Sequence, residues 1–600
     1  MARKYLITIL VLFAVLLTTF SIINYLEYSE ESSHEKNLET FESEDDMREY
    51  ISYSEVSHSY TASDDVMLET AGREMMDMGV EADDTVVQLK GIDEPDIVKT
   101  DVERLYYQGQ FREKLNTSII DLEELEIEKN ITESGSLLLY ENVLIVFGNE
   151  KVTGFDRESG IELWSESFEH RYETARLRED EIVLVLSEGI DYYSPCPIRP
   201  YGDVSIPCGS IIRPGFNFDS DTTYSFVSIN PEDGSVNNEN SFVGDRSSEF
   251  YITDENIYFT YKGQEKRSDV FFEFLIEHSS IGNELRDRLR EVKSYELSEN
   301  AYNAEINFLM ERYFEENEER AQVIEKELEE FLVNRKRENH WTTVARLDET
   351  LEIDGEEVVP GNVRNRMHMH ENNGNFFIVS NIEPGYGMWT NRTNDIYVLS
   401  EDFSIDERFE ELTRDSYPEV RFSGENLFIT EDNNRIKHFS TLDLEFKNTF
   451  RERSGFLFDV NNTLISVGRQ TDDYNLTTSI FDLESGEKVD RKVFDVRWSR
   501  VTHDMKAFQI DPESGVMFLP TNEEALIIEF KEEIQAHELN ISSAGRAFFL
   551  DDIIVIGRGE IKSFSQDDLS ETNRLEIPLE DLTRYREEGI EIEEDAEIPR

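Results

Sequence analysis

Short apolar stretches of about five residues recur along most of the chain, and a polar turn separates each from the next. Glu, Asp, Gly or Asn precedes most of them, as a hairpin turn requires. We predict that the nine clearest stretches are the middle strands of repeated sheet units, at 104–108, 143–148, 182–187, 256–261, 375–380, 426–430, 463–468, 515–519 and 552–557.

The strand after several of these ends in a short acidic turn, as at 156–160, 231–234 and 484–486. The units repeat at very roughly 45 residues, and four short strands at that period are typical of β-propeller blades. A small twisted sheet cannot bury both faces alone, so stacking in a ring is expected. The predicted fold is therefore an all-β propeller. Nine units exceed the usual number, so we expect eight four-stranded blades, or seven, with a terminal unit shared across the closure.

One segment, at about 267–337, breaks the strand pattern. It is highly charged, and apolar residues such as Phe271, Leu275, Leu309 and Leu328 return at helical spacing. The segment 279–282 separates two helices. We predict a helical hairpin or small bundle inserted between two strands of one blade, with its apolar stripe packed on itself or on the ring. A partner-binding groove is the alternative.

The first 26 residues read as a membrane segment. An apolar run from Tyr5 to Leu26 follows Arg3 and Lys4 and precedes several acids. Its length suffices to cross a bilayer, and the charge bias places the remaining chain outside the cell. We expect a single-pass anchor, or a secreted protein if this segment is a cleaved signal peptide.

Three further regions complete the organisation. Residues 27–85 are acidic and Ser-rich, so they are expected to form a flexible stalk with one short helix near 46–54. The propeller is expected over 86–582. An acidic tail, 583–600, ends the chain.

The net charge of −71 arises from 130 acidic residues against 59 Lys and Arg. Such a chain repels itself in dilute buffer, whereas molar salt shortens the Debye length to roughly 3 Å. Because the acids are spread along the chain, we expect adaptation to high salt. Nucleic acid is a poor partner, since no basic patch could neutralise phosphates. A calcium-loaded or polycation-binding surface is the alternative.

Cys196 and Cys208 are the two cysteines of the chain and share one Pro- and Gly-containing stretch. In an exported protein, a local disulfide is expected. Asn-x-Ser/Thr sequons, which could carry glycans outside the cell, occur at Asn116, Asn130, Asn391, Asn461, Asn475 and Asn540.

The segment 91–101, Gly-Ile-Asp-Glu-Pro-Asp-Ile-Val-Lys-Thr-Asp, closely resembles the opening motif of a family of secreted bacterial and archaeal proteins. That family carries a C-terminal β-propeller distantly related to WD-40 repeats, and this chain looks like a haloarchaeal member. Further segments are similar, at 334–338, 342–347, 361–367, 419–424 and 503–508.

The resemblance covers about 47–580 and implies a propeller outside the cytoplasm, but no common activity. The family usually has Gly after the position of Asp101, where this chain has Val102. The tight turn expected there is therefore in question.

Four carboxylates, those of Asp93, Glu94, Asp96 and Asp101, lie within nine positions of this motif. Oxygen-rich clusters can bind calcium, although the spacing differs from that of an EF-hand loop. The leading interpretation is structural: Lys99 pairs with one carboxylate and the motif seals the ring, and a calcium or functional acid site is the alternative. No cofactor is evident from the sequence, and calcium is the one alternative left open.

The run Met-His-Met-His at 367–370 contains ligand types that suit copper. Alternation along a strand would place both Met on one face and both His on the other, which leaves too few ligands for a metal. We expect a core-facing Met pair and half-buried His.

His503, Asp504 and Lys506 could serve acid–base chemistry. The sequence lacks a nucleophile elbow, a phosphate-binding loop, zinc spacing and a dinucleotide fingerprint. We therefore assign no catalytic residue and expect a blade turn at this position.

The leading functional hypothesis is a cell-surface binding or scaffold protein, with a protein or glycan ligand held by the loops of the propeller. An extracytoplasmic, hydrolase-like enzyme that uses carboxylates and His at the channel is the second hypothesis. A calcium-stabilised structural envelope protein is the third.

Overall fold

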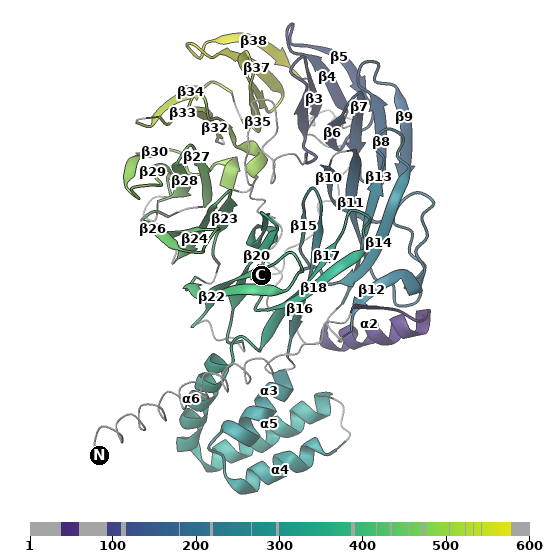
Figure 1. The fold of residues 1–600 in the computed structure, drawn as a ribbon, viewed down its shortest axis with the longest axis vertical. Helices are drawn as coiled ribbons and strands as arrows, with labels where there is room; N and C mark the ends of the chain where they lie inside the picture. Colours follow the sequence, from purple (N-terminus) through teal and green to yellow (C-terminus); the bar gives the residue numbers. More distant parts are fainter. Residues whose placement is uncertain are drawn as a thin grey trace, which may run out of the picture.

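The computed structural model describes residues 38–58 and 93–577, apart from internal gaps at 110–115, 179, 216–219, 266, 296–298, 386–390, 416, 432–434, 454, 471–473, 503, 522–523, 532 and 542. It forms a ring of nine sheets, which are antiparallel except for one parallel pair of strands in blade 3 (Figure 1). Strand order within each blade follows the sequence from the axis outwards, except in blade 3.

Blades 1 and 2 have four strands each: β2 (Val98–Thr100), β3 (Arg104–Gln108), β4 (Thr117–Asp121) and β5 (Glu126–Ile131), then β6 (Ser136–Tyr140), β7 (Val143–Phe147), β8 (Lys151–Asp156) and β9 (Glu162–Ser167). Every residue of the middle strand β7 is buried, because neighbouring blades cover both of its faces.

Blade 3 contains β10 (Arg171–Arg178), β11 (Glu181–Gly189), β13 (Thr222–Ile229) and β14 (Val236–Gly244). Its outer edge carries two more strands, β12 (Ile211–Pro214), which pairs parallel with β14, and β1 (Leu38–Thr40), which pairs antiparallel with β12. The helix α2 (Glu44–His58) follows β1. It begins where the Ser43 hydroxyl accepts a hydrogen bond from the amide of Asp46.

Blades 4 to 6 have four strands each: β15 (Phe250–Ile252), β16 (Ile257–Gln264), β17 (His340–Leu347) and β18 (Ile353–Pro360); β19 (Met369–Asn372), β20 (Asn375–Ile382), β21 (Thr393–Leu399) and β22 (Ile405–Thr413); β23 (Val420–Ser423), β24 (Asn426–Glu431), β25 (Arg435–Ser440) and β26 (Phe446–Phe450).

Blades 7 to 9 complete the ring with β27 (Phe456–Val460), β28 (Thr463–Arg469), β29 (Leu476–Asp482) and β30 (Lys488–Val493); β31 (Gln509–Asp511), β32 (Val516–Pro520), β33 (Ala525–Glu529) and β34 (Gln535–Leu539); β35 (Arg546–Phe549), β36 (Asp552–Gly557), β37 (Glu560–Ser565) and β38 (Glu571–Glu576). Short 3-10 turns, Cys208–Ser210, Arg366–His368, Arg500–Thr502 and Met505–Ala507, lie in the connections.

The expected number of eight blades is wrong, and the ring has nine. Each of the nine predicted middle strands belongs to its own sheet, and neither terminal sheet borrows a strand from the other end of the chain. Apolar packing closes the ring instead, because side chains of blade 1 such as Leu105 and Tyr107 share one core with Phe548 and Ile556 of blade 9.

The insertion lies between β16 and β17 of blade 4, as predicted, and projects from the ring (Figure 1). It contains α3 (Arg267–Glu273), a π-helical turn (Phe274–His278), α4 (Asn283–Lys293), α5 (Glu299–Glu316) and α6 (Glu318–Asn334). Its apolar side chains, including Phe274, Leu289 and Met310, form a separate small core. The break expected at 279–282 separates the π-helical turn from α4.

The insertion is fixed to the ring by three consecutive cations that follow α6. Arg335 pairs with Glu265 and Glu273, and Lys336 with Glu411. Arg337 reaches Asp395 on the central strand β21, where the Arg337 Nε to Asp395 Oδ2 distance is 2.7 Å.

Part of the region expected to be a stalk is ordered, since β1 and α2 lie within it; α2 overlaps the short helix expected near 46–54. Within 38–58 and 93–577, no helix is long and apolar enough to cross a membrane. The expected anchor at 5–26 and the expected tail at 583–600 lie outside the described residues. Cys196 and Cys208 form the predicted disulfide.

The two faces of the ring differ in their connections. One face, the turn face, carries the turns between the first and second and between the third and fourth strands of each blade; none exceeds the six residues 230–235. The other face, the loop face, carries the disulfide-containing connection 190–221, the helical insertion and the segments 361–368 and 494–508.

The turn after Asp101 forms without glycine. Val102 adopts a left-handed φ of 75°, a conformation that is unusual for a β-branched residue. The turn is held because the Asp101 Oδ1 atom accepts a hydrogen bond from the Arg104 amide (2.7 Å) and Thr100 Oγ1 accepts one from Val102 (3.1 Å).

We predict that Val102→Gly raises the free energy of unfolding by about 1 kcal/mol, because glycine adopts this φ without strain. Denaturant unfolding at constant molar salt measures the change. Val489→Gly is the matched control, because Val489 is similarly exposed (49% against 47%) on β30 without a positive φ. That control should lose stability, and a loss in both variants would contradict the assignment of strain to Val102.

Candidate functional site

The segment that contains the predicted acidic motif crosses the inner strands of the ring. Asp93 forms a bridge with Leu177 on β10, and Asp96 forms one with Leu137 on β6. The chain then enters β2. The motif thus lies against blades 2 and 3 before it becomes the innermost strand of blade 1.

Glu94 is the centre of a buried cluster of three cations, one from blade 3 and two from connections between blades. Its Oε1 atom lies 2.8 Å from Nη2 of Arg176 on β10, and its Oε2 atom lies 3.2 Å from Nζ of Lys506 and 3.9 Å from Nη2 of Arg366. Lys506 also donates a hydrogen bond to the carbonyl of Pro95 (2.8 Å). One carboxylate therefore connects blade 3 with the connections that lead into blades 5 and 8.

Asp96 forms a second, bidentate pair. Its two oxygens accept hydrogen bonds of 2.7 Å from Nε and Nη2 of Arg546, the first residue of β35 in blade 9. Nη1 of Arg546 also donates to Asp504 (2.8 Å). We call Asp93, Glu94, Asp96, Lys99, Arg176, Arg366, Asp504, Lys506 and Arg546 the axial ion network.

The cations decide the ionisation of both acids. Burial opposes the charged form of Glu94, but Arg176, Lys506 and Arg366 outweigh it and hold the pKa of Glu94 below its usual value. Burial likewise opposes ionisation of Asp96, and Arg546 reverses the effect, so the pKa of Asp96 is lowered. Both groups are carboxylates at neutral pH, and the network is permanently charged.

The structure brings six of the eight predicted site residues together: Asp93, Glu94, Asp96, Lys99, Asp504 and Lys506. Lys99 pairs with Asp93. Asp101 lies apart at the turn face, where it contacts Arg157 and accepts a hydrogen bond from the Tyr106 hydroxyl (2.9 Å). His503 lies outside the described residues.

The calcium hypothesis gains no support from these contacts. Asp93, Glu94, Asp96 and Asp101 each face a Lys or Arg side chain. In the described part of the chain, no group of three or more His, Cys, Asp or Glu is arranged to hold a metal ion.

The expected alternation at 367–370 is wrong, because a 3-10 turn covers Arg366–His368 and the strand begins only at Met369. Met367 and Met369 belong to different cores, and both His are fully rather than half buried. Burial lowers the pKa of His368 and of His370 to about 4, so both rings are neutral.

Glu249, which the sequence interpretation missed, lies in the loop-face connection 245–249. Desolvation raises its pKa to about 7, although Lys262 and Arg366 act in the opposite direction. The pKa of the neighbouring Asp245 is also raised by burial. Only the fold could reveal Glu249, because its surroundings come from distant segments. A carboxyl group that titrates near neutrality is a candidate functional group.

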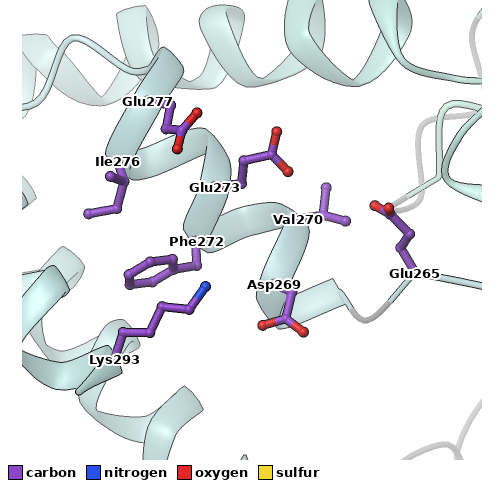
Figure 2. A pocket seen from close by; sticks show the side chains of 8 residues that line it. All are labelled: Glu265, Asp269, Val270, Phe272, Glu273, Ile276, Glu277 and Lys293. Carbon is purple, nitrogen blue, oxygen red and sulfur yellow. The ribbon is translucent and has the colours of Figure 1, made fainter. Parts of the chain in front are cut away.

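A second candidate site is a pocket of about 310 Å³ at the root of the helical insertion (Figure 2). Acids line it on α3 and the turn that follows, among them Asp269, Glu273 and Glu277, together with the apolar Val270 and Ile276. The remaining lining residues are Glu265, Phe272 and Lys293, and the ammonium group of Lys293 lies 4.6 Å from the centre of the Phe272 ring.

Comparison with known proteins agrees with this architecture. The β-propeller domain family matches residues 83–168 and 156–430, and the chain belongs to this family. An uncharacterised protein from Archaeoglobus fulgidus is 30% identical over 96% of this chain and 100% of its own length. Another, from Methanocaldococcus jannaschii, is 27% identical over 84% of this chain and 85% of its own length.

Solved structures with some similarity include BamB from Moraxella catarrhalis, with 8% identity, a TM-score of 0.31, and coverage of 79% of this chain and 97% of that one. The dihydro-heme d1 dehydrogenase NirN has 10% identity and a TM-score of 0.35, over 77% of this chain and 71% of that one.

We predict that Arg546→Met lowers the free energy of unfolding by about 3–5 kcal/mol, because the carboxylate of Asp96 loses its buried partner. Denaturant unfolding at molar salt measures the loss. In the control Arg574→Met, on β38 of the same blade, the ion pair with Glu571 is solvent-exposed, so its loss should change stability far less. Equal decreases in the free energy of unfolding for both variants would show that the pair between Arg546 and Asp96 has no special role.

We predict that Glu249→Gln stabilises the fold at pH 8 and leaves it unchanged near pH 4.5. The folded-state pKa of Glu249, about 7, exceeds the ordinary value of 4.5. Ionisation of Glu249 is therefore less favourable in the folded than in the unfolded protein, and the free energy of unfolding falls as pH rises from 4.5 to 7. Gln keeps the neutral form at every pH. Unfolding curves across this range give the comparison, with the exposed Glu123→Gln as the control. A variant whose advantage does not grow with pH would contradict the shifted titration.

Proposed function

We propose that this protein is a cell-surface binding or scaffold β-propeller, adapted to high salt, whose ligand is held by the loop face. One observation carries the proposal. Three strongly exposed tyrosines, Tyr193 (84%), Tyr417 (62%) and Tyr474 (60%), lie in three different connections of that face. Exposed tyrosines are over-represented at the centres of protein interfaces, since they bury a large area at low entropy cost.

The geometry around these tyrosines supports a binding role. The Arg364 guanidinium lies 4.5 Å from the centre of the Tyr417 ring, so the two present a joint apolar and cationic surface. Tyr474 has a left-handed φ of 61°, and a strained backbone in an exposed loop is typical of functional positions. A protein or glycan ligand suits both features.

The charge and the apolar segment at 5–26 support a location outside the cell at the membrane, with the ring on the outer side. Relatives from two archaea are compatible with an archaeal source. The axial ion network is then a structural element, because its acids are engaged by internal cations.

The extracytoplasmic enzyme is the second candidate, and Glu249 is the observation that favours it. A general base with a pKa near 7 is matched to hydrolytic work at neutral pH. Binding remains the better-supported function, since the acids first considered for catalysis are paired with Lys or Arg.

We predict that Tyr193→Ala, Tyr417→Ala and Tyr474→Ala each reduce the capture of an envelope component by the full-length protein at least tenfold. The measurement is affinity capture from envelope extracts at molar salt, followed by titration of the recovered component. Leu442→Ala and Ile161→Ala are the controls, because these residues match Tyr417 and Tyr474 in exposure but lie in turn-face connections. Equal effects on both faces, or no specific capture, would overturn the proposal.

A further inference from the structure

The segment that follows the apolar run is built into the rim of blade 3. Leu38 pairs with Pro214, and Thr40 with Ile212, so β1 becomes the outermost strand of a six-stranded sheet. Phe41, Met47, Tyr50 and Ile51 are all buried in one core with the disulfide-bonded connection, including Cys196 and Ile206. We call residues 38–58 the N-terminal arm.

Two arginines fix the arm further. Arg48 of α2 donates hydrogen bonds to the carbonyls of Tyr192 (3.3 Å) and Tyr193 (3.0 Å), which lie beside the disulfide. Arg213 on β12 lies over the rings of Phe41 (5.1 Å) and Tyr50 (4.8 Å) and pairs with Glu39. The arm is therefore part of the folded ring and not a separate stalk.

We propose that the rim of blade 3 faces the bilayer and that the ring is suspended edge-on from the N-terminal arm. This inference rests on the proposed membrane anchor. Only the eleven residues 27–37 separate Leu26, the last residue of the apolar run, from β1. A chain of that length spans at most about 40 Å, whereas a free stalk over 27–85 would reach about 200 Å.

The position of the arm fixes which parts of the ring are close to the lipid. In Figure 1, α2 and the outer strand β12 of blade 3 lie at the lower right of the ring, whereas blades 8 and 9 lie in its upper part. The exposed surface of α2 is acidic, with Glu44 and Asp45 in its first turn. The covalent link, and not attraction to anionic headgroups, therefore keeps this rim near the membrane.

Energy transfer in liposomes tests the orientation. The full-length protein carries a donor at Glu49→Cys on α2 or at Asp567→Cys in the exposed turn of blade 9, and the bilayer carries an acceptor on its headgroups. The native cysteines are joined in the disulfide, so each variant has one reactive thiol. We expect transfer at position 49 to be several-fold stronger than at position 567.

Two insertions of forty Gly/Ser residues complete the design. An insertion after Asn37 lengthens the link and should reduce transfer at position 49, while the same insertion after Asp64 should leave it unchanged. Equal transfer at positions 49 and 567, or transfer at position 49 that ignores the first insertion, would overturn the orientation. Failure of the protein to float with the liposomes would instead refute the membrane anchor itself.

Discussion

The ring depends on buried charge pairing at its axis. Nine sheets close without a shared strand, so apolar packing between blades 9 and 1 needs a second connection near the axis. Glu94 and Asp96 supply it, because they bring Arg176, Lys506 and Arg546 from blades distant in sequence to one short segment. Burial of such charged pairs costs desolvation energy. Once a pair is formed, its separation is also unfavourable, because it would leave an unpaired charge in the low-dielectric interior.

Charge is therefore divided between two environments. Acids coat a chain of net charge −71, whereas cations such as Arg176 and Arg546 are almost fully buried. Salt screens the mutual repulsion of the exposed acids but barely affects buried pairs. High ionic strength can therefore relieve the surface without loosening the axis.

Sequence periodicity predicted the propeller, all nine middle strands and the insertion, and the two neighbouring cysteines predicted the disulfide. It failed on the blade number because an unusual count was discounted in favour of the common one. The sequence analysis also missed a feature of the turns between the third and fourth strands. In three blades, a glycine with a positive φ stands in this turn, namely Gly160, Gly234 or Gly486. In two others, a buried apolar residue with a positive φ, Leu351 or Phe403, stands there. The partners of Glu94 could not be predicted, since Arg366 and Lys506 are hundreds of residues away and only the fold brings them together.

Each blade is formed by consecutive strands of the chain, apart from the N-terminal strand added to blade 3 and the helical insertion within blade 4. Duplication or deletion of one such set of strands would change the circumference of the ring without rethreading any sheet. The number of blades can thus change during evolution. The main limit is whether the side chains of Glu94 and Asp96 still reach their partners across a wider or narrower axis.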